Sequence, residues 1–316
     1  MLVAGRIGFF HAQEVDRVQA SEDLGKWHLH GPSDELSGGP SLRVTRLPCG
    51  GSATRPTPTS NARSEDRIGR HAKDRRERIR QLMKELQEET KQQQEAEKAA
   101  KDKDEPPPPQ TGDSLPSHKI PTTADGTPTP KAQRNFTDPE SRIMKSGDGY
   151  VLAYNCQAMV DAACQIIVAQ AVTNQPPDVE HMVPMIARTL ENCGMKPAKL
   201  VADTGYYSEA NVCETMKWGI DPYIATGRRR HDEQVISPRG RAPAGLSTKE
   251  VMARKLATKS GAAIYSRRKV IVEPVFGQIK EARGFRRFLL RGLRKVRGEW
   301  SLITLTHNLL KLHAYA

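Results

Sequence analysis

The sequence predicts an α/β domain in its second half, residues 136–316, because β-rich and helical segments alternate there. Short runs rich in Val, Ile, Tyr and Ala are separated by segments whose apolar residues recur at helical spacing. The predicted order is strand, strand, helix, strand, helix, strand, followed by a long helical region. Apolar residues make up only 37% and aromatic residues 5% of the chain, so part of it is expected to lie outside any core.

The first part of the chain divides into three segments of different composition. Residues 1–63 are crowded with Gly, Ser, Pro and Arg and show neither strand nor helix periodicity, which predicts a disordered segment. Residues 64–103 are rich in Glu, Lys, Arg, Gln and Ala, which predicts one long charged helix. Its few apolar residues leave two interpretations open, a solvated helix and a coiled coil. The proline-rich residues 104–135 are expected to form a linker.

Turn and cap residues locate the elements of the second half. "YVLAYNCQAMVD" and "CQIIVAQAVTN" predict a hairpin whose turn holds Asp161. Asp178 is a candidate N-cap for the helix that follows. "AKLVAD" predicts a short buried strand, Ser208 caps the next helix, and "IDPYIA" predicts another strand. Ser247 and Glu250 form a capping-box pattern at the start of a further helix.

Charge and cysteine usage restrict the function classes. The formal net charge is +12, which favours a polyanion such as nucleic acid as the partner, although a basic surface without a partner stays open. The five cysteines show no CxxC spacing, so neither a disulfide framework nor a zinc ribbon is indicated. The chain has neither an apolar run of membrane-spanning length nor a signal peptide, so a cytoplasmic protein without a membrane partner is expected.

Two carboxylates stand in positions that suggest chemistry. Asp203 ends the apolar run in "LVADTGYYSEAN", and the carboxyl ends of strands in open α/β sheets face a reactive crevice. A turn or helix cap is the alternative for Asp203. Glu273 lies among apolar residues in "YSRRKVIVEPVFGQIKEARGF", where a carboxylate is costly unless it is paired or binds a metal. Because Pro274 follows it, a position near a helix start is the alternative.

These residues carry a resemblance to a known family. "VADTGYYSEAN" and "YSRRKVIVEPVFGQIKEARGFRRFLLRGLRKVRGEWSLITLTHNLLKL" resemble the second and third catalytic blocks of bacterial insertion-sequence transposases of the DDE class. "DPESRIMKSGDGYVLAYNCQAMVD" resembles the segment that precedes those blocks. The resemblance runs from Phe136 to Leu312 and implies a partial RNase H-like mixed sheet flanked by helices. It also implies DNA strand cleavage and transfer at insertion-sequence ends, with two protomers paired on the DNA.

The resemblance assigns roles to individual residues. Asp203 and Glu273 correspond to the second and third acidic ligands of two divalent ions, Mg²⁺ or Mn²⁺, which hold the attacking and leaving oxygens of phosphoryl transfer. Lys280 is expected on the same helix side as Glu273, where its ammonium suits a DNA phosphate. Tyr265 and Arg268 take the positions of the family's Tyr and Arg, although the Arg-to-Glu spacing is one residue longer than the family form. Ordinary surface charge is the alternative for Lys280 and Arg268.

A basic segment near the C-terminus resembles a surface that grips the DNA backbone without reading bases, and Arg286 and Arg287 are its candidate contacts. A solvated helical face over an apolar core is the alternative, and the two are compatible. His307 and His313 are interpreted as residues at the edge of the core, and His231 as a possible phosphate contact. The basic residues of this segment are Arg283, Arg286, Arg287, Arg291, Arg294, Lys295 and Arg297.

One departure from the family pattern affects the expected activity. The family's first aspartate normally lies in a strand reading Asp-Gly-Thr, and residues 1–63 show no such strand. "ADGT" at residues 124–127 matches these letters only by coincidence, because it lies in the proline-rich linker with no apolar run before it, and Asp161 is interpreted as a residue of the hairpin turn. A truncated copy that lacks a metal ligand and a core strand, with impaired or no activity, is therefore expected. Three functions stay open: a transposase, a catalytically inactive DNA-binding remnant, and a polar-helix interaction protein.

Overall fold

The computed structural model describes residues 1–11, 17–19, 28–30, 60–101, 115–123, 125–129, 132–146, 149–227 and 237–315. The chain divides into two compact units. The larger comprises Met1–Glu14, Ala99–Lys119 and Asp138–Ala316, and the smaller comprises Val15–Lys98 and Ile120–Thr137. The larger unit holds every candidate site residue among those described. His231 lies outside the described residues.

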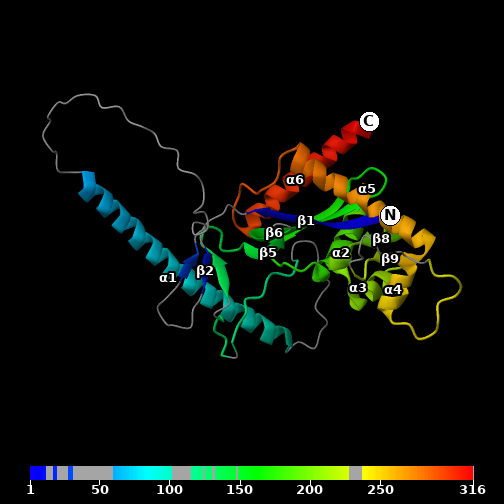
Figure 1. Ribbon diagram of the computed structural model, residues 1–316, viewed down its shortest axis with the longest axis horizontal. Coiled ribbons are helices and arrows are strands. Elements are labelled where there is room, and N and C mark those ends of the chain that lie inside the picture. The colour runs from blue at the N-terminus through cyan, green and yellow to red at the C-terminus, as the bar shows by residue number, and fades with distance from the viewer. Residues whose placement is uncertain are drawn as a thin grey trace, which may run out of the picture. The chain divides into compact units, whose positions relative to one another are not determined.

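The larger unit is built on a mixed sheet (Figure 1). Antiparallel pairing joins β7, β6 and β1, and parallel pairing joins β1, β8 and β9. A further strand, β5, lies on the same edge of β6 as β7. It pairs with the N-terminal part of β6, whereas β7 pairs with the C-terminal part. This sheet with helices packed on it is compatible with an RNase H-like fold. The strands are β1 (Leu2–His11), β5 (Arg142–Ser146), β6 (Gly149–Asp161), β7 (Ile167–Thr173), β8 (Lys199–Ala202) and β9 (Asp221–Ile224).

The position of β1 corrects the expectation that residues 1–63 supply no core strand. β1 lies between β6 and β8, and Leu2, Val3 and Ala4 are 6%, 0% and 2% exposed. The strand was missed because a central strand shows no apolar–polar alternation, and because Gly5 and Gly8 interrupt the apolar run. Of residues 12–59, the structure describes only β2 (Arg17–Gln19) and β3 (His28–His30), so the predicted disorder lies mostly outside the described residues.

Helices cover both faces of the sheet (Figure 1). α5 and α6 lie on one side, with α2 and α3 on the other. Ser208 accepts a hydrogen bond from the backbone of Asn211, and Ser247 and Glu250 form the predicted capping box. Buried residues of α5 and α6, including Val275 and Trp300 at 0% exposure, join the strands in one core. The helices are α2 (Met182–Cys193), α3 (Glu209–Lys217), α4 (Thr248–Ala257), α5 (Lys259–Gly277) and α6 (Leu293–Tyr315).

The smaller unit combines a long helix with a three-stranded sheet. α1 (Ser60–Lys101) is a single helix, and β4 (Gln133–Asn135) pairs with β2 in the sheet order β3, β2, β4. Leu86 of α1 is buried with Ile120 and Ala132, so this helix is not solvated on all sides. No described helix has both the length and the apolar character needed to cross a membrane.

Candidate functional site

Asp203 is the first residue after β8, at the edge of the sheet where the parallel strands β8 and β9 end. It caps the short 3₁₀ helix η2 (Thr204–Tyr206), and its Oδ1 accepts a hydrogen bond of 3.0 Å from the Gly205 N–H. The capping interpretation is therefore correct in geometry. This cap does not exclude a role of Asp203 in a reactive site, because Asp203 also lines a cavity.

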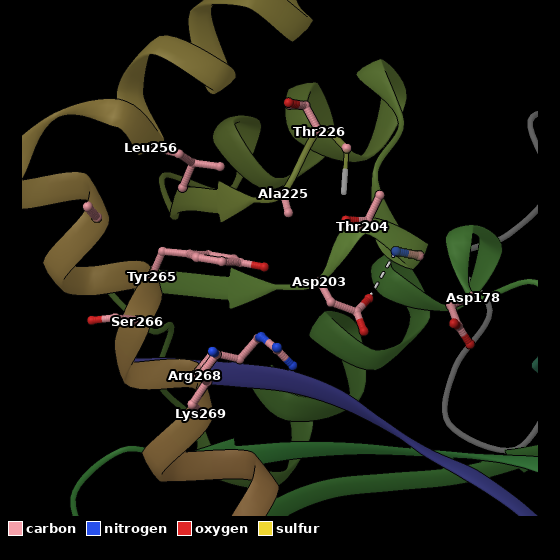
Figure 2. Close-up of a pocket in the computed structure, with 13 residues that line it drawn as sticks. Asp178, Asp203, Thr204, Ala225, Thr226, Leu256, Tyr265, Ser266, Arg268 and Lys269 are labelled. Atoms are coloured by element: carbon pink, nitrogen blue, oxygen red, sulfur yellow. Dashed lines mark hydrogen bonds between the residues drawn. The ribbon is translucent and has the colours of Figure 1, made fainter. Parts of the chain in front are cut away.

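The cavity has a volume of about 730 Å³ and lies between the ends of β8 and β9 and helix α5. Its lining combines carboxylates, hydroxyl groups and cationic groups. Figure 2 shows the guanidinium of Arg268 extending from α5 toward Asp203, with Tyr265 on the same helix. The structure thus brings together three of the predicted site residues. The lining residues are Asp178, Asp203, Thr204, Gly205, Ala225, Thr226, Gly227, Leu256, Ala262, Tyr265, Ser266, Arg268 and Lys269.

Glu273 lies on α5 but is not among the residues that line this cavity. Its Oε1 is 3.2 Å from an Arg268 terminal nitrogen, and its side chain is 52% exposed. The expected apolar surroundings are wrong, because Val272 and Val275 are buried while Glu273 faces outward. The position near a helix start is also wrong, since Pro274 lies inside α5. Arg268 is therefore the link between the cavity and Glu273.

Lys280 belongs to a π-helical turn, Gln278–Ala282, that follows α5. Lys280 and Glu273 were predicted to share one helix face because an α-helix has 3.6 residues per turn. The π-helical turn interrupts this periodicity between them. Burial lowers the pKa of the Lys280 ammonium, while Cys156 of β6 and Glu281 act in the opposite direction. Lys280 does not line the cavity. Its assignment as a catalytic and DNA-contacting residue remains a prediction.

Arg286 and Arg287 lie in the segment between the π-helical turn and α6, and both are exposed. Arg286 forms an ion pair with Glu281. An exposed ion pair of this kind contributes little to stability, so exchange of Glu281 for a phosphate costs little. Both guanidinium groups are therefore accessible to a polyanion.

Acidic side chains hold the backbone of this arginine-bearing segment. Glu299 Oε1 accepts from the Leu289 N–H at 2.9 Å, and Asp138 Oδ1 accepts from the Gly292 N–H at 3.2 Å. These bonds tie the segment to α6 and to the loop before β5. The cationic side chains thus project from a fixed backbone, which reduces the entropy lost when they bind a ligand.

The first aspartate that the resemblance implies has no counterpart among the residues of β1, which reads LVAGRIGFFH. The parallel register pairs Leu2 with Leu200 and Val3 with Val201, and its continuation places Gly5 level with Asp203. A side chain there has no room, because a Cβ on Gly5 would lie 2.4 Å from Val272 Cγ2.

The two substitutes that were considered for this aspartate are both turn residues. Asp161 Oδ2 accepts from the backbone N–H groups of Ala163 and Cys164, each at 2.9 Å. Asp125 lies in a turn that is closed by a hydrogen bond of 2.8 Å from the Thr123 N–H to the Thr127 carbonyl. The interpretation of Asp161 as a turn residue is therefore confirmed, and Asp125 lies in a turn as well. Within the described ranges, no group of three or more His, Cys, Asp or Glu side chains is arranged to hold a metal ion.

Asp178 is a cavity residue that sequence reasoning missed. It was predicted to cap a helix, yet its side chain makes no capping hydrogen bond. It is 3% exposed and lines the cavity with Asp203. The available signal was a pair of polar residues, Asn155 and Gln157, at alternate positions of an otherwise apolar strand, where they face one side.

Comparison with known proteins gives one match. Residues 230–313 match the family model of a transposase DDE domain. The matched range includes Glu273, Lys280, Arg286 and Arg287, and ends before α6 does, whereas Asp203 lies outside it. No curated protein and no solved structure matches the chain.

Proposed function

We propose that this chain, a relative of the DDE-class transposases through residues 230–313, binds DNA and performs metal-assisted strand cleavage and transfer at insertion-sequence ends. One observation supports the proposal above all others. Asp203, at the carboxyl end of β8, lies in the same cavity as Tyr265 and Arg268 of α5 and opposite them. Carboxylate, hydroxyl and guanidinium groups in one cavity suit a phosphodiester and a cation. Pairing of two protomers on DNA, in the cytoplasm, belongs to the same proposal.

The donor chemistry of the cavity fits a hard divalent ion such as Mg²⁺ or Mn²⁺. Asp203 offers carboxylate oxygens, and Thr204 and Thr226 add hydroxyl oxygens to the lining, which are the ligand types that Mg²⁺ prefers. A Cβ on Gly205 would lie 3.2 Å from Asp203 Oδ1, so the glycine allows the close approach of this carboxylate to the turn. When bound, such an ion supplies charge stabilisation for the leaving oxygen and activation of a water or a 3′-hydroxyl.

Arg268 is the residue that positions a DNA phosphate in this proposal. Its ion pair with Glu273 involves a half-exposed carboxylate, so the pair is weak and exchangeable. A phosphate that entered the cavity would compete with Glu273 for the planar guanidinium, which binds phosphate through two parallel hydrogen bonds. If the phosphate replaced Glu273 at Arg268, Glu273 would be released for the metal-binding role that the resemblance assigns to it.

The test uses the full chain and DNA that carries the sequences flanking its own coding region. Binding is measured by gel shift between low and moderate salt, and cleavage is followed on end-labelled DNA with and without Mg²⁺. We expect affinity that falls steeply with salt, and Mg²⁺-dependent nicks that Asp203→Asn abolishes without loss of binding. Asp161→Asn removes the same charge at the hairpin turn and serves as the matched control. Cleavage that survives Asp203→Asn would refute the assignment.

A second candidate function is DNA binding without strand cleavage. It is favoured by the composition of β1, which carries no carboxylate beside Asp203. In that case the same gel-shift experiment gives salt-sensitive binding, while no Mg²⁺-dependent product forms at any enzyme concentration. An interaction protein that ignores DNA would give neither result.

A further inference from the structure

Helix α6 is apolar on two sides. Val296, Trp300 and Ile303 face the core and are 0%, 0% and 3% exposed. A second set of apolar side chains lies at spacings of three, four and three residues, which place them in one row along a helix. We call this row the outer leucine stripe. Its members are Leu302, Leu305, Leu309 and Leu312, and they are 63%, 52%, 55% and 60% exposed.

The outer leucine stripe has the pattern of a helix-packing surface. Its spacing is that of the a and d positions of a coiled coil over two heptads. A helix that is apolar on both sides is expected to be buried on both sides. In Figure 1 the C-terminal end of α6 projects past the strands of the larger unit. A contiguous exposed apolar surface of this kind marks an interaction site.

The surface of the stripe is uncharged, which restricts its partner. Residues 300–310 contain no Asp, Glu, Lys or Arg. Two neighbouring cations make other contacts: Arg283 donates to the Ile303 carbonyl at 3.0 Å, and Lys311 donates to Gln165 Oε1 at 2.7 Å. An uncharged leucine surface is complementary to a second surface of the same kind. An identical copy of the chain supplies such a surface in a two-fold symmetric pair.

The exposed area is sufficient for a small specific interface. With the flanking Leu310 and Tyr315, the stripe offers on the order of 400 Å² of apolar surface per copy, at roughly 100 Å² for a fully exposed leucine side chain and 200 Å² for tyrosine. Because about 65% of a homodimer interface is apolar, two copies correspond to a total interface of about 1,200 Å². This area lies at the lower end of stable interfaces, so we expect a dissociation constant on the order of 1 μM.

We propose that a second copy of this chain covers the outer leucine stripe, with the two α6 helices packed antiparallel. Leu302 then contacts Leu312 of the partner subunit, and Leu305 contacts Leu309 of the partner subunit. Orientation follows from Lys295, which continues the stripe one heptad before Leu302.

Antiparallel packing places Lys295 past the C-terminal end of the partner helix, where the helix dipole is negative. Parallel packing would set it opposite Lys295 of the partner subunit, where the two charges repel each other. The inference goes beyond the proposed pairing of protomers on DNA, because it names the surface and needs no DNA.

The test is sedimentation velocity of the full chain without DNA, at about 0.1–100 μM, which spans the expected dissociation constant. We expect a reversible equilibrium between monomer and dimer. Leu305→Glu and Leu309→Glu each bring a carboxylate into the centre of the interface and should weaken dimerisation about 30-fold or more. Since both leucines are more than half exposed, the variants should keep the thermal midpoint of the wild type. Val251→Glu, at a 48% exposed apolar residue of α4, is the matched control and should dimerise as the wild type does.

Cross-linking tests the orientation. Mild oxidation should join Leu305→Cys to Leu309→Cys when the two proteins are mixed, whereas Leu305→Cys alone should not exceed the wild-type chain, which reports the native cysteines. Efficient self-joining of Leu305→Cys would overturn the antiparallel arrangement.

The inference as a whole is overturned by a wild-type chain that stays monomeric, or by a dimer that persists in both glutamate variants. A monomer that binds neutral phosphatidylcholine vesicles would assign the stripe to a lipid surface and would overturn it as well. These measurements involve neither DNA nor Asp203, so the proposed function can fail or stand independently of them.

Discussion

Substitution of Gly5 by alanine tests whether the N-terminal strand lies under α5 in the centre of the sheet. Gly5 is buried, and an added Cβ would lie 2.4 Å from Val272 Cγ2 and 2.9 Å from Phe276 Cε2. Val272 is β-branched and 2% exposed, so it has little freedom to move away. We therefore expect Gly5→Ala to destabilise the protein.

The size of the effect follows from two opposing contributions. Overpacking of a closed core position costs about 1–3 kcal/mol. Replacement of glycine by alanine restricts the unfolded chain and returns about 0.4–1 kcal/mol. The net loss of about 1–2 kcal/mol corresponds to a decrease in Tm of about 2–8 °C for a domain of this size. Differential scanning calorimetry and urea denaturation of the full chain measure both quantities.

Gly277→Ala is the matched control. Gly277 is the last residue of α5, has helical backbone angles, and has no atom within 4 Å of an added Cβ. Alanine there should be neutral or stabilising by up to about 1 kcal/mol. If Gly5→Ala is as stable as the wild type while Gly277→Ala behaves as expected, the close packing of β1 against α5 is refuted.

Three further outcomes are expected. Tyr206→Phe removes the donor to the buried Gln157 and should lower the free energy of unfolding by about 1–3 kcal/mol, measured by urea denaturation. Burial lowers the pKa of His181, so the imidazole of the unfolded chain is protonated at a higher pH than that of the folded chain. The free energy of unfolding should therefore decrease as pH falls below about 6.5 and should not change for this reason between about pH 7 and 8. Urea denaturation midpoints measured across this pH range check the sign. Replacement of Arg286 and Arg287 together by glutamine should weaken DNA binding and reduce the slope of log K against log salt by about 2, measured by fluorescence anisotropy.

The elements with strong local signals were predicted well from sequence. The hairpin around Asp161, the short strand before Asp203, and the capping box at Ser247 depend on turn and cap chemistry within a few residues, and the structure has all three. Strand β1 was not predicted, because its burial between β6 and β8 depends on partners more than 140 residues away along the chain. Its identity as a strand comes from tertiary pairing and not from its own pattern.

The site could be predicted only in part, because local sequence patterns locate some of its residues while tertiary contacts determine the others. Asp203 was found because it directly follows a recognisable strand, and Tyr265 and Arg268 because they accompany Glu273 in a motif. The distance between Glu273 and the cavity depends on the rotation of α5, which helical periodicity alone does not set. Asp178 was assigned to a cap because local sequence cannot reveal that two amides of a distant strand hold its carboxylate.

Cleavage of DNA by the wild-type chain and by Asp203→Asn, compared at equal occupancy of the DNA and in the presence of Mg²⁺, tests the central claim most directly. The account predicts that strand breaks at the ends of the flanking sequence form with the wild type and disappear with Asp203→Asn, while both proteins bind DNA equally. Equal cleavage by the two proteins, or wild-type cleavage that persists in excess chelator, would contradict it.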